Sequence, residues 1–412
     1  MNKINDLLNK IKTKIKKNFC FLDKNRKFNL MEVVALLIIT SVFGMFAGGV
    51  LMYQKGTLNY GIKKELREFM NMYAEILNEY YTDIKEDGLL ESGVKGMISY
   101  LGDPYSVYMD EPTSIAFNEK INGEYVGIGI EIIQYIDYTV EVKDSYENGP
   151  AYIAGIRNGD ILKKVDDKDV TKMNLVDISN LVKGKEGTKV KITVLRNDRE
   201  LDFMITRGSV DIKSIESDML SYQDNKIGYI KIDIFAANTS EQFEEELKKM
   251  EEEGLDSLII DVRNNSGGYL SSVSKILSLF LEKGDLIYQM KTKDKIEKVY
   301  DKTNESRNYK IAVLVNGVSA SASELLTASI METYNGYIVG TKTFGKSKVQ
   351  KTQELSNGGM IKFTYQEWLT PNGNNIGDIG ITPQYEVEYE FNENMNFDSQ
   401  IQKALELLTQ SE

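Results

Sequence analysis

The sequence predicts a mixed α/β protein, α+β overall, in which an N-terminal transmembrane helix precedes a helical segment, a β-rich domain and an α/β domain. Three observations predict this class. Strand-like and helix-like segments alternate from residue 226 onward. Apolar and β-branched runs fill residues 121–207, a length that suits a small independent domain. Near the N-terminus, the 21 residues from Val33 to Tyr53 (53 − 33 + 1) carry no charge.

The first 29 residues differ sharply in charge from the rest of the chain. They hold nine lysine or arginine residues and two aspartates, a net charge of +7 (9 − 2), while the whole chain carries −12, so that residues 30–412 carry −19 (−12 − 7). The Val33–Tyr53 run would extend about 31 Å as a helix, one hydrocarbon thickness. We therefore expect a cytoplasmic tail over 1–29, a transmembrane helix over 30–54 and an extracytoplasmic remainder, because basic flanks stay in the cytoplasm. A cleaved secretory signal is the less favoured alternative.

Residues 58–118 are predicted to be helical. Apolar residues recur at steps of three and four between Leu66 and Tyr80, and a second helix is expected from Leu89 to Leu101, before Gly102-Asp103-Pro104. The apolar stripe is compatible with a core or with a dimer interface, and the pattern does not decide between them.

Composition excludes several kinds of catalytic site. The chain has no histidine, so it cannot contain a Ser-His-Asp triad, a Cys-His pair or an imidazole zinc site. Its single cysteine, Cys20, lies in the expected cytoplasmic tail, so the exported part can form no disulfide. We find no phosphate-loop lysine motif and no carboxylate cluster suited to a metal, and we expect no cofactor. The acidity of the exported part disfavours nucleic acid as a partner.

The stretch from Ile311 to Gln353 is the most informative part of the chain. A predicted buried strand, Ile311–Val315, is followed by the run Ser319-Ala320-Ser321-Ala322-Ser323 and then by residues at helical spacing. A serine at such a junction exposes its hydroxyl beside the free N–H groups of the helix. Without histidine, the base for a serine nucleophile must be another residue, and lysine is the usual substitute. Lys346 follows a glycine in this stretch. The alternative is that small residues here only allow tight helix–strand packing.

This stretch resembles the Ser-Lys core of the C-terminal processing peptidases, or tail-specific proteases. Their pattern is a SASASE run, about 25 residues, then TFGKG and a glutamine four residues after the lysine. Here Ser321 precedes Lys346 by 25 positions (346 − 321), and Gln350 follows by four (350 − 346). The resemblance implies that Ser321 is the nucleophile, Lys346 the general base and Gln350 the residue that orients the lysine. Ser347 stands where the family usually has glycine, and Lys348 where a smaller residue is common.

A second part of the resemblance concerns the oxyanion hole. The predicted strand Leu255–Val262 ends in Arg263-Asn264-Asn265-Ser266-Gly267-Gly268, which resembles the family's RNNPGG turn with Ser266 in place of proline. The resemblance implies that backbone N–H groups of Gly267, in preference to Gly268, and of Ala322 hold the oxyanion. An ordinary Gly-Gly turn is the alternative.

Residues 121–207 resemble a PDZ domain, most closely over NGPAYIAGIRNGDILKKVDDKDV. PDZ domains bind chain ends by adding the peptide as a strand and capturing its carboxylate on backbone N–H groups. The resemblance implies that this role falls to the loop Gly127, Ile128, Gly129 and Ile130.

Taken together, these features predict a membrane-anchored serine endopeptidase that cleaves exported proteins near their C-terminal ends. Its partners would be substrates with apolar, unstructured C-termini, with a homodimer as a further possibility. The rival prediction is a membrane-tethered pseudoprotease that captures chain ends without cleaving them. We expect the PDZ domain over 121–207, the protease core over 208–391 and a C-terminal helix over 392–412, so that the resemblance covers about residues 60–412.

Overall fold

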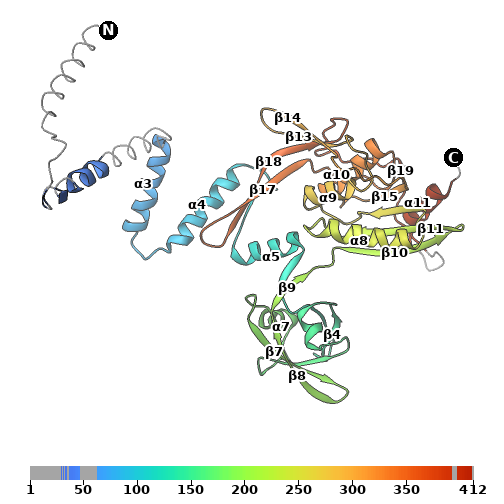
Figure 1. Ribbon diagram of the computed structural model, residues 1–412, viewed down its shortest axis with the longest axis horizontal. Coiled ribbons are helices and arrows are strands. Elements are labelled where there is room, and N and C mark those ends of the chain that lie inside the picture. Colours follow the sequence, from blue (N-terminus) through green and yellow to red (C-terminus); the bar gives the residue numbers. More distant parts are fainter. Residues whose placement is uncertain are drawn as a thin grey trace, which may run out of the picture. The chain divides into compact units, whose positions relative to one another are not determined.

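The structure is a computed structural model that describes residues 29, 31, 33–34, 37–46, 63–391 and 397–410. The chain divides into two compact units, Met1–Leu89 and Leu90–Glu412. Figure 1 labels the helices and strands along the chain.

In the first unit, residues 37–46 are helical with exposed apolar side chains. Among the described residues, no helix has both the length and the apolar character needed to cross a membrane. Part of the predicted span Val33–Tyr53 lies outside the described residues, as does the whole basic tail before residue 29.

The predicted helices after residue 58 are confirmed as α3 (Lys64–Glu79) and α4 (Glu86–Tyr100), which begins in this unit. Helix α3 buries none of its side chains. The apolar residues that defined its periodicity are exposed, among them Leu66, Phe69, Met70 and Ile76. Within the described residues, this stripe therefore does not form a core.

The second unit contains a β-rich module with its own apolar core. Its six-stranded sheet has the order β3-β4-β5-β7-β8, with β6 paired to β5. Two helices, α6 and α7, accompany the sheet, and a ribbon of β2 and β9 flanks the module in sequence. The bounds are β2 (Glu124–Gly127), β3 (Ile130–Gln134), β4 (Val140–Ser145), α6 (Pro150–Ala154), β5 (Ile161–Val165), β6 (Lys168–Asp169), α7 (Leu175–Val182), β7 (Lys189–Arg196), β8 (Arg199–Thr206) and β9 (Gly208–Asp211).

The alternating segments after residue 226 form the expected α/β layer. A six-stranded sheet has the order β10-β11-β12-β15-β16-β19, in which only the β10–β11 pair is antiparallel. Apolar residues of α8, α9 and α10 pack in one core cluster with strand residues, and those of α11 pack in another. The bounds are β10 (Ile215–Tyr222), β11 (Asn225–Ile232), α8 (Thr239–Glu252), β12 (Ser257–Asp261), α9 (Leu270–Leu277), β15 (Lys310–Val315), α10 (Ala322–Ser329), β16 (Tyr337–Gly340), β19 (Tyr385–Glu386) and α11 (Ser399–Thr409).

A second sheet contributes a long hairpin to the same unit. Strands follow the order β1-β18-β13-β14, and β17 pairs only with β18, so that the hairpin projects as a ribbon (Figure 1). Helix α5 follows β1 directly. The bounds are β1 (Val107–Met109), α5 (Glu111–Asn122), β13 (Leu286–Lys291), β14 (Ile296–Tyr300), β17 (Lys348–Glu354) and β18 (Met360–Leu369).

The strand-to-helix junction predicted around Ser321 is confirmed. Strand β15 ends at Val315 and α10 begins at Ala322. The helix then widens into a π-helical turn, Ile330–Tyr334, and ends where Asn335 adopts a left-handed conformation, φ 62°. The mixed α/β class predicted from the sequence is thus present in the described residues.

Candidate active site

Ser321 occupies a strained position at the start of α10. It is the N-cap residue, with φ 55° and ψ −110°, a conformation that residues with a side chain rarely adopt. Its backbone N–H donates to Glu324 Oε2 at 2.8 Å. The sharp turn places Ser321 in the lining of a cavity of about 590 Å³.

The three serines of the run have different surroundings. The Ser319 hydroxyl donates to the carbonyl oxygen of Val262 at 2.8 Å, and the Ser323 hydroxyl donates to that of Asn265 at 2.8 Å. Both serines are fully buried, whereas Ser321 is partly exposed and is the one that lines the cavity. Two serines therefore fasten the junction to the neighbouring turn, and the third is open to a ligand.

The neighbouring turn follows β12 and brings its glycines to Ser321. A Cβ placed on Gly267 would lie 3.0 Å from Ser321 Cβ and 3.1 Å from Ala322 N, so only a glycine fits so close. The Gly267 N–H donates to Asn265 Oδ1 at 2.8 Å, while in the described chain no acceptor receives the N–H of Gly268. Both glycines line the cavity.

Glu324 links the serine to the lysine. Its carboxylate is fully buried and accepts four hydrogen bonds, from the N–H groups of Ser321, Gly345 and Lys346 and from the Thr343 hydroxyl. The distances lie between 2.6 and 2.8 Å. One side chain thereby fixes the backbone of both candidate reacting residues.

Lys346 lies in a largely buried, aromatic setting. Burial lowers the pKa of Lys346, the Lys362 ammonium lowers it further, and Asp103 and Glu324 act in the opposite direction. Its Nζ sits 4.7 Å from the centre of the Tyr105 ring, a contact that favours the charged form.

The sequence suggested different neighbours for Lys346. In the sequence, the cations closest to Lys346 are Lys342 and Lys348, and the closest aromatic residue is Phe344. In the structure the cation that lowers the pKa is Lys362, and Phe344 is 53% exposed. Lys362 was missed because it lies on β18, and the hairpin that folds β18 back onto β17 was not predicted.

Gln350 lines the same cavity as Ser321 and Lys346, but its amide points elsewhere. Gln350 Nε2 donates to Thr364 Oγ1 at 3.2 Å. Among the described residues, no hydrogen bond joins Gln350 to Lys346 or the Ser321 hydroxyl to the Lys346 amine. Such bonds are often long in ligand-free sites and shorten once substrate is bound.

The two departures from the pattern have a structural place. Ser347 is buried, and its carbonyl accepts the Trp368 N–H at 2.9 Å, so the larger residue fits into the hairpin base. Lys348 pairs with Asp103 at 3.5 Å. Ser266, in place of proline, is exposed at the cavity edge.

A second groove lies on the β-rich module, between β3 and α7. Its volume is about 340 Å³, and its lining includes Gly127, Ile128 and Ile130 of the predicted peptide-binding loop but not Gly129. Gly129 has φ 78°, which turns the chain between β2 and β3. Beside it, burial raises the pKa of Tyr125 to about 12.

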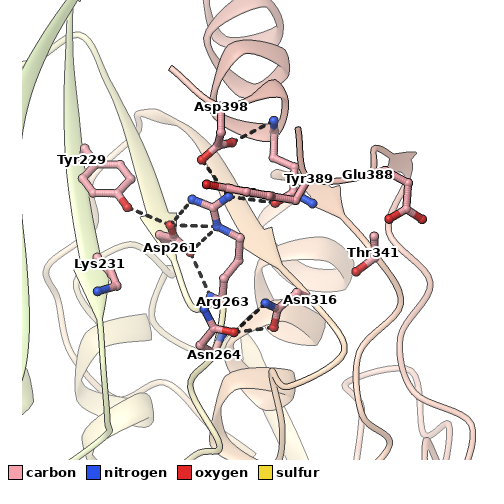
Figure 2. A pocket seen from close by; sticks show the side chains of 11 residues that line it. Tyr229, Lys231, Asp261, Arg263, Asn264, Asn316, Thr341, Glu388, Tyr389 and Asp398 are labelled. Carbon is pink, nitrogen blue, oxygen red and sulfur yellow. Dashed lines mark hydrogen bonds and ion pairs between the residues drawn. The ribbon is translucent and has the colours of Figure 1, made fainter. Parts of the chain in front are cut away.

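A third cavity, on the α11 side of the main sheet, is polar, and the charged groups at its centre pair with one another (Figure 2). Arg263 pairs with Asp261 at 2.7 Å and with Asp398 at 3.0 Å, and Tyr229 donates to Asp261 at 2.7 Å. Arg263 thus binds two carboxylates, and it fastens the end of β12 to the start of α11.

Sequence reasoning missed several residues at the Ser321 cavity. Glu324 stands three positions after Ser321 in the quoted motif but received no role. Asn265 holds the glycine turn, since its Nδ2 also donates to the Ile232 carbonyl at 2.8 Å. Tyr105 follows Gly102-Asp103-Pro104, which the sequence marks only as the end of a predicted helix. No metal-binding group of acidic or sulfur side chains occurs among the residues that the structure covers.

Comparisons with known proteins bear directly on this site. Family models match the chain as peptidase family S41 over residues 226–387, as a PDZ domain over 141–196 and as the activating protease CtpB N-terminal domain over 50–113. A probable CtpA-like serine protease of Staphylococcus haemolyticus is 34% identical over 378 residues, which cover 90% of this chain and 75% of that protein. One from Staphylococcus saprophyticus is 32% identical and covers 95% of this chain and 79% of the relative.

Among solved structures, the photosystem II D1 C-terminal processing protease is similar, with 24% identity, a TM-score of 0.47, and coverage of 83% of this chain and 91% of that one. The sequence relatives, which are similar over most of their own length, carry the assignment. The chain is therefore a PDZ-containing serine hydrolase that belongs to peptidase family S41, the CtpA-like C-terminal processing proteases.

Proposed function

We propose that the protein cleaves exported proteins near their C-terminal ends with Ser321 as nucleophile and Lys346 as general base. The observation that carries the proposal is the Glu324 carboxylate, which holds the backbone N–H groups of both residues at the edge of one cavity. The lowered pKa of Lys346 supports the second role, because only a neutral amine can accept the serine proton.

In the proposed reaction, Ser321 Oγ bonds to the scissile carbonyl carbon while its proton passes to Lys346 Nζ. The carbonyl oxygen becomes an oxyanion. The C–N bond then breaks as Lys346 returns the proton to the leaving amine, and water repeats the sequence on the acyl-enzyme. Gln350 would orient the lysine after exchanging its bond to Thr364.

The oxyanion would be held by the Ala322 N–H and an amide of the glycine turn. Gly267 is the proposed second donor because it lies closest to Ser321 and Ala322. Its N–H would then be shared with Asn265 Oδ1, as bifurcated hydrogen bonds allow. Two such donors are typically worth 10²–10³-fold each in rate, so about that loss is expected where one is blocked.

The groove on the PDZ module would receive the apolar C-terminus of the substrate, with the 127–130 loop against its carboxylate. The apolar run before Tyr53 would anchor the protein in the membrane with the catalytic part outside the cytoplasm. The exposed stripe of α3 is available for a homodimer. The lining of the groove supports peptide binding, and the charge-free sequence pattern supports the membrane anchor. The exposed apolar side chains of α3 support the dimer.

Three variants test the chemistry. Ser321→Ala and Lys346→Arg should both abolish peptide cleavage, the second because guanidinium does not give up its proton. A fluorophosphonate probe should label the wild-type chain but not Ser321→Ala. Lys302→Gln, an exposed lysine outside the cavity, serves as control and should cleave normally. Turnover near the wild-type rate by Lys346→Arg would exclude Lys346 as the base.

A further inference from the structure

We propose that the Ser321 cavity selects substrates with acidic side chains within a few residues of the bond that is cut. This inference rests on the proposed function, since it takes Ser321 as the nucleophile and assigns a substrate class to the same cavity. The PDZ module, in contrast, would bind only the C-terminal end of the substrate, in a different groove.

The cavity is strongly basic in an acidic protein. Five lysines line it, and no aspartate or glutamate does, although the whole chain carries a charge of −12. These lysines come from α5, from β17 and β18, and from the loop before β17; they are Lys120, Lys346, Lys348, Lys351 and Lys362. A cleft lined by one sign of charge concentrates ligands of the opposite sign.

Two of the five lysines are already accounted for. Lys346 is the proposed base, and Lys348 pairs with Asp103. The remaining three, Lys120, Lys351 and Lys362, have no carboxylate partner within the described part of the chain. Glu324, the nearest buried carboxylate, is saturated by its four donors.

Aromatic rings hold two of these three lysines without satisfying them. Lys351 Nζ lies 4.9 Å from the centre of the Phe363 ring, and Lys362 Nζ lies 5.1 Å from that of Phe117. A ring face attracts an ammonium group but does not accept its three N–H bonds as carboxylate oxygens do. The ammonium groups are thus positioned and still able to bind an acid.

Several basic side chains elsewhere in the described chain contact two carboxylates each. Lys191, Lys231 and Lys249 each contact two carboxylates, and Arg263 is enclosed by Asp261 and Asp398 (Figure 2). The contrast indicates that the missing carboxylates of the cavity are to be supplied by the substrate. Lys362 gains most, because burial lowers its pKa and an added anion would compensate for lost hydration.

Matched peptides test the proposal on the wild-type chain. Three versions of one peptide with a mapped cleavage site are prepared. The two residues before the cleaved bond and the two residues after it are all Glu, all Gln or all Lys, and the C-terminus is the same in each. The kcat/KM of the Glu peptide should exceed that of the Gln peptide by at least about fivefold, the value of one partly exposed ion pair, and the Lys peptide should be poorest. The preference should shrink as salt rises from about 0.05 M to about 0.5 M.

Two double variants locate the preference. Lys120→Gln/Lys351→Gln should lower the Glu-to-Gln ratio of kcat/KM toward one, and Lys362 accounts for the preference that remains. Lys293→Gln/Lys298→Gln removes the same charge from exposed positions at the β13–β14 hairpin, outside the cavity, and should keep the wild-type ratio. Each ratio compares two peptides cleaved by the same variant, so a general loss of activity in that variant does not change the ratio.

Equal kcat/KM for the Glu, Gln and Lys peptides in the wild-type chain would overturn the proposal while leaving the proposed protease function intact. If no peptide were cleaved, the proposed function would fail instead. The inference would still be tested by binding of amidated peptides to the Ser321→Ala chain, where the Glu peptide should again bind at least about fivefold more tightly than the Gln peptide. Equal binding would overturn it.

Discussion

At the scale of single residues, Glu324 fixes the backbone of both proposed reacting residues, Ser321 and Lys346. It is buried and faces four donors, so both carboxylate oxygens act only as acceptors. In Glu324→Gln, an NH₂ group would replace one oxygen and confront N–H donors. Each unsatisfied buried donor costs about 1–3 kcal/mol, so we expect a lower Tm and a loss of more than about tenfold in kcat/KM. Calorimetry and peptide cleavage measure both; full reactivity of the variant toward fluorophosphonate would contradict the linking role.

Lys362 gives a prediction about pH. The proposed base must be neutral, so kcat/KM should rise with pH through the pKa of Lys346, which burial and Lys362 lower. Lys362→Met removes a positive charge, which raises that pKa; the rising limb should move to higher pH and the rate at pH 7 should fall. Lys362→Arg keeps the charge and should keep the limb near its wild-type position. A limb unmoved in Lys362→Met would show that Lys362 does not tune the base.

The residues predicted for the site from sequence were those fixed by local spacing. Ser321, Lys346 and Gln350 were named from a resemblance to a family whose motif has the same separations, and the structure gathers them around one cavity. Lys362 and Tyr105 come from other strands and loops, and no sequence periodicity predicts that they lie near Lys346. The hydrogen bond from Gln350 to Thr364 could not be predicted from the sequence either, because it depends on the register of β17 against β18.

At the scale of elements, the sequence predicts those helices and strands whose apolar residues form a continuous pattern. The strand before Ser321 and the C-terminal helix α11 both occur near their expected positions, because burial of their apolar residues imposes the pattern. The separate sheet that contains β17 and β18 was not predicted, since it assembles strands as distant as β1 and β18. This sheet brings Lys351 and Lys362 to the cavity.

The PDZ module yields a prediction at this scale. Gly127, Ile128 and Ile130 of its 127–130 loop line a groove together with apolar residues of β3 and α7. The Ser321→Ala chain should bind a peptide with a free apolar C-terminus about tenfold or more tightly than the amidated peptide, because charge-assisted hydrogen bonds to the carboxylate contribute roughly 1.5–3 kcal/mol. Titration calorimetry compares the two. Equal affinities would remove carboxylate capture from the proposed function.

At the scale of the whole molecule, charge is distributed unevenly along the chain. Residues 1–29 carry +7 (9 − 2) and the remainder −19 (−12 − 7), with the apolar run from Val33 between them. A basic segment on one side of an apolar run favours retention of that side in the cytoplasm. The acidic remainder would lie outside, where the basic cavity is the feature that attracts acidic substrate segments.

This arrangement predicts the topology of the intact protein. Protease added to intact cells or right-side-out vesicles should digest epitope tags placed after residue 60 and spare a tag placed before residue 30, because only the first would be outside the membrane. Detergent permeabilisation is the control, since both tags should then be digested. A variant with the nine basic residues of the first segment changed to glutamine should lose the uniform orientation, because the charge bias that sets it is gone. Protection of the C-terminal tags in intact vesicles would reverse the proposed orientation and place the catalytic cavity in the cytoplasm.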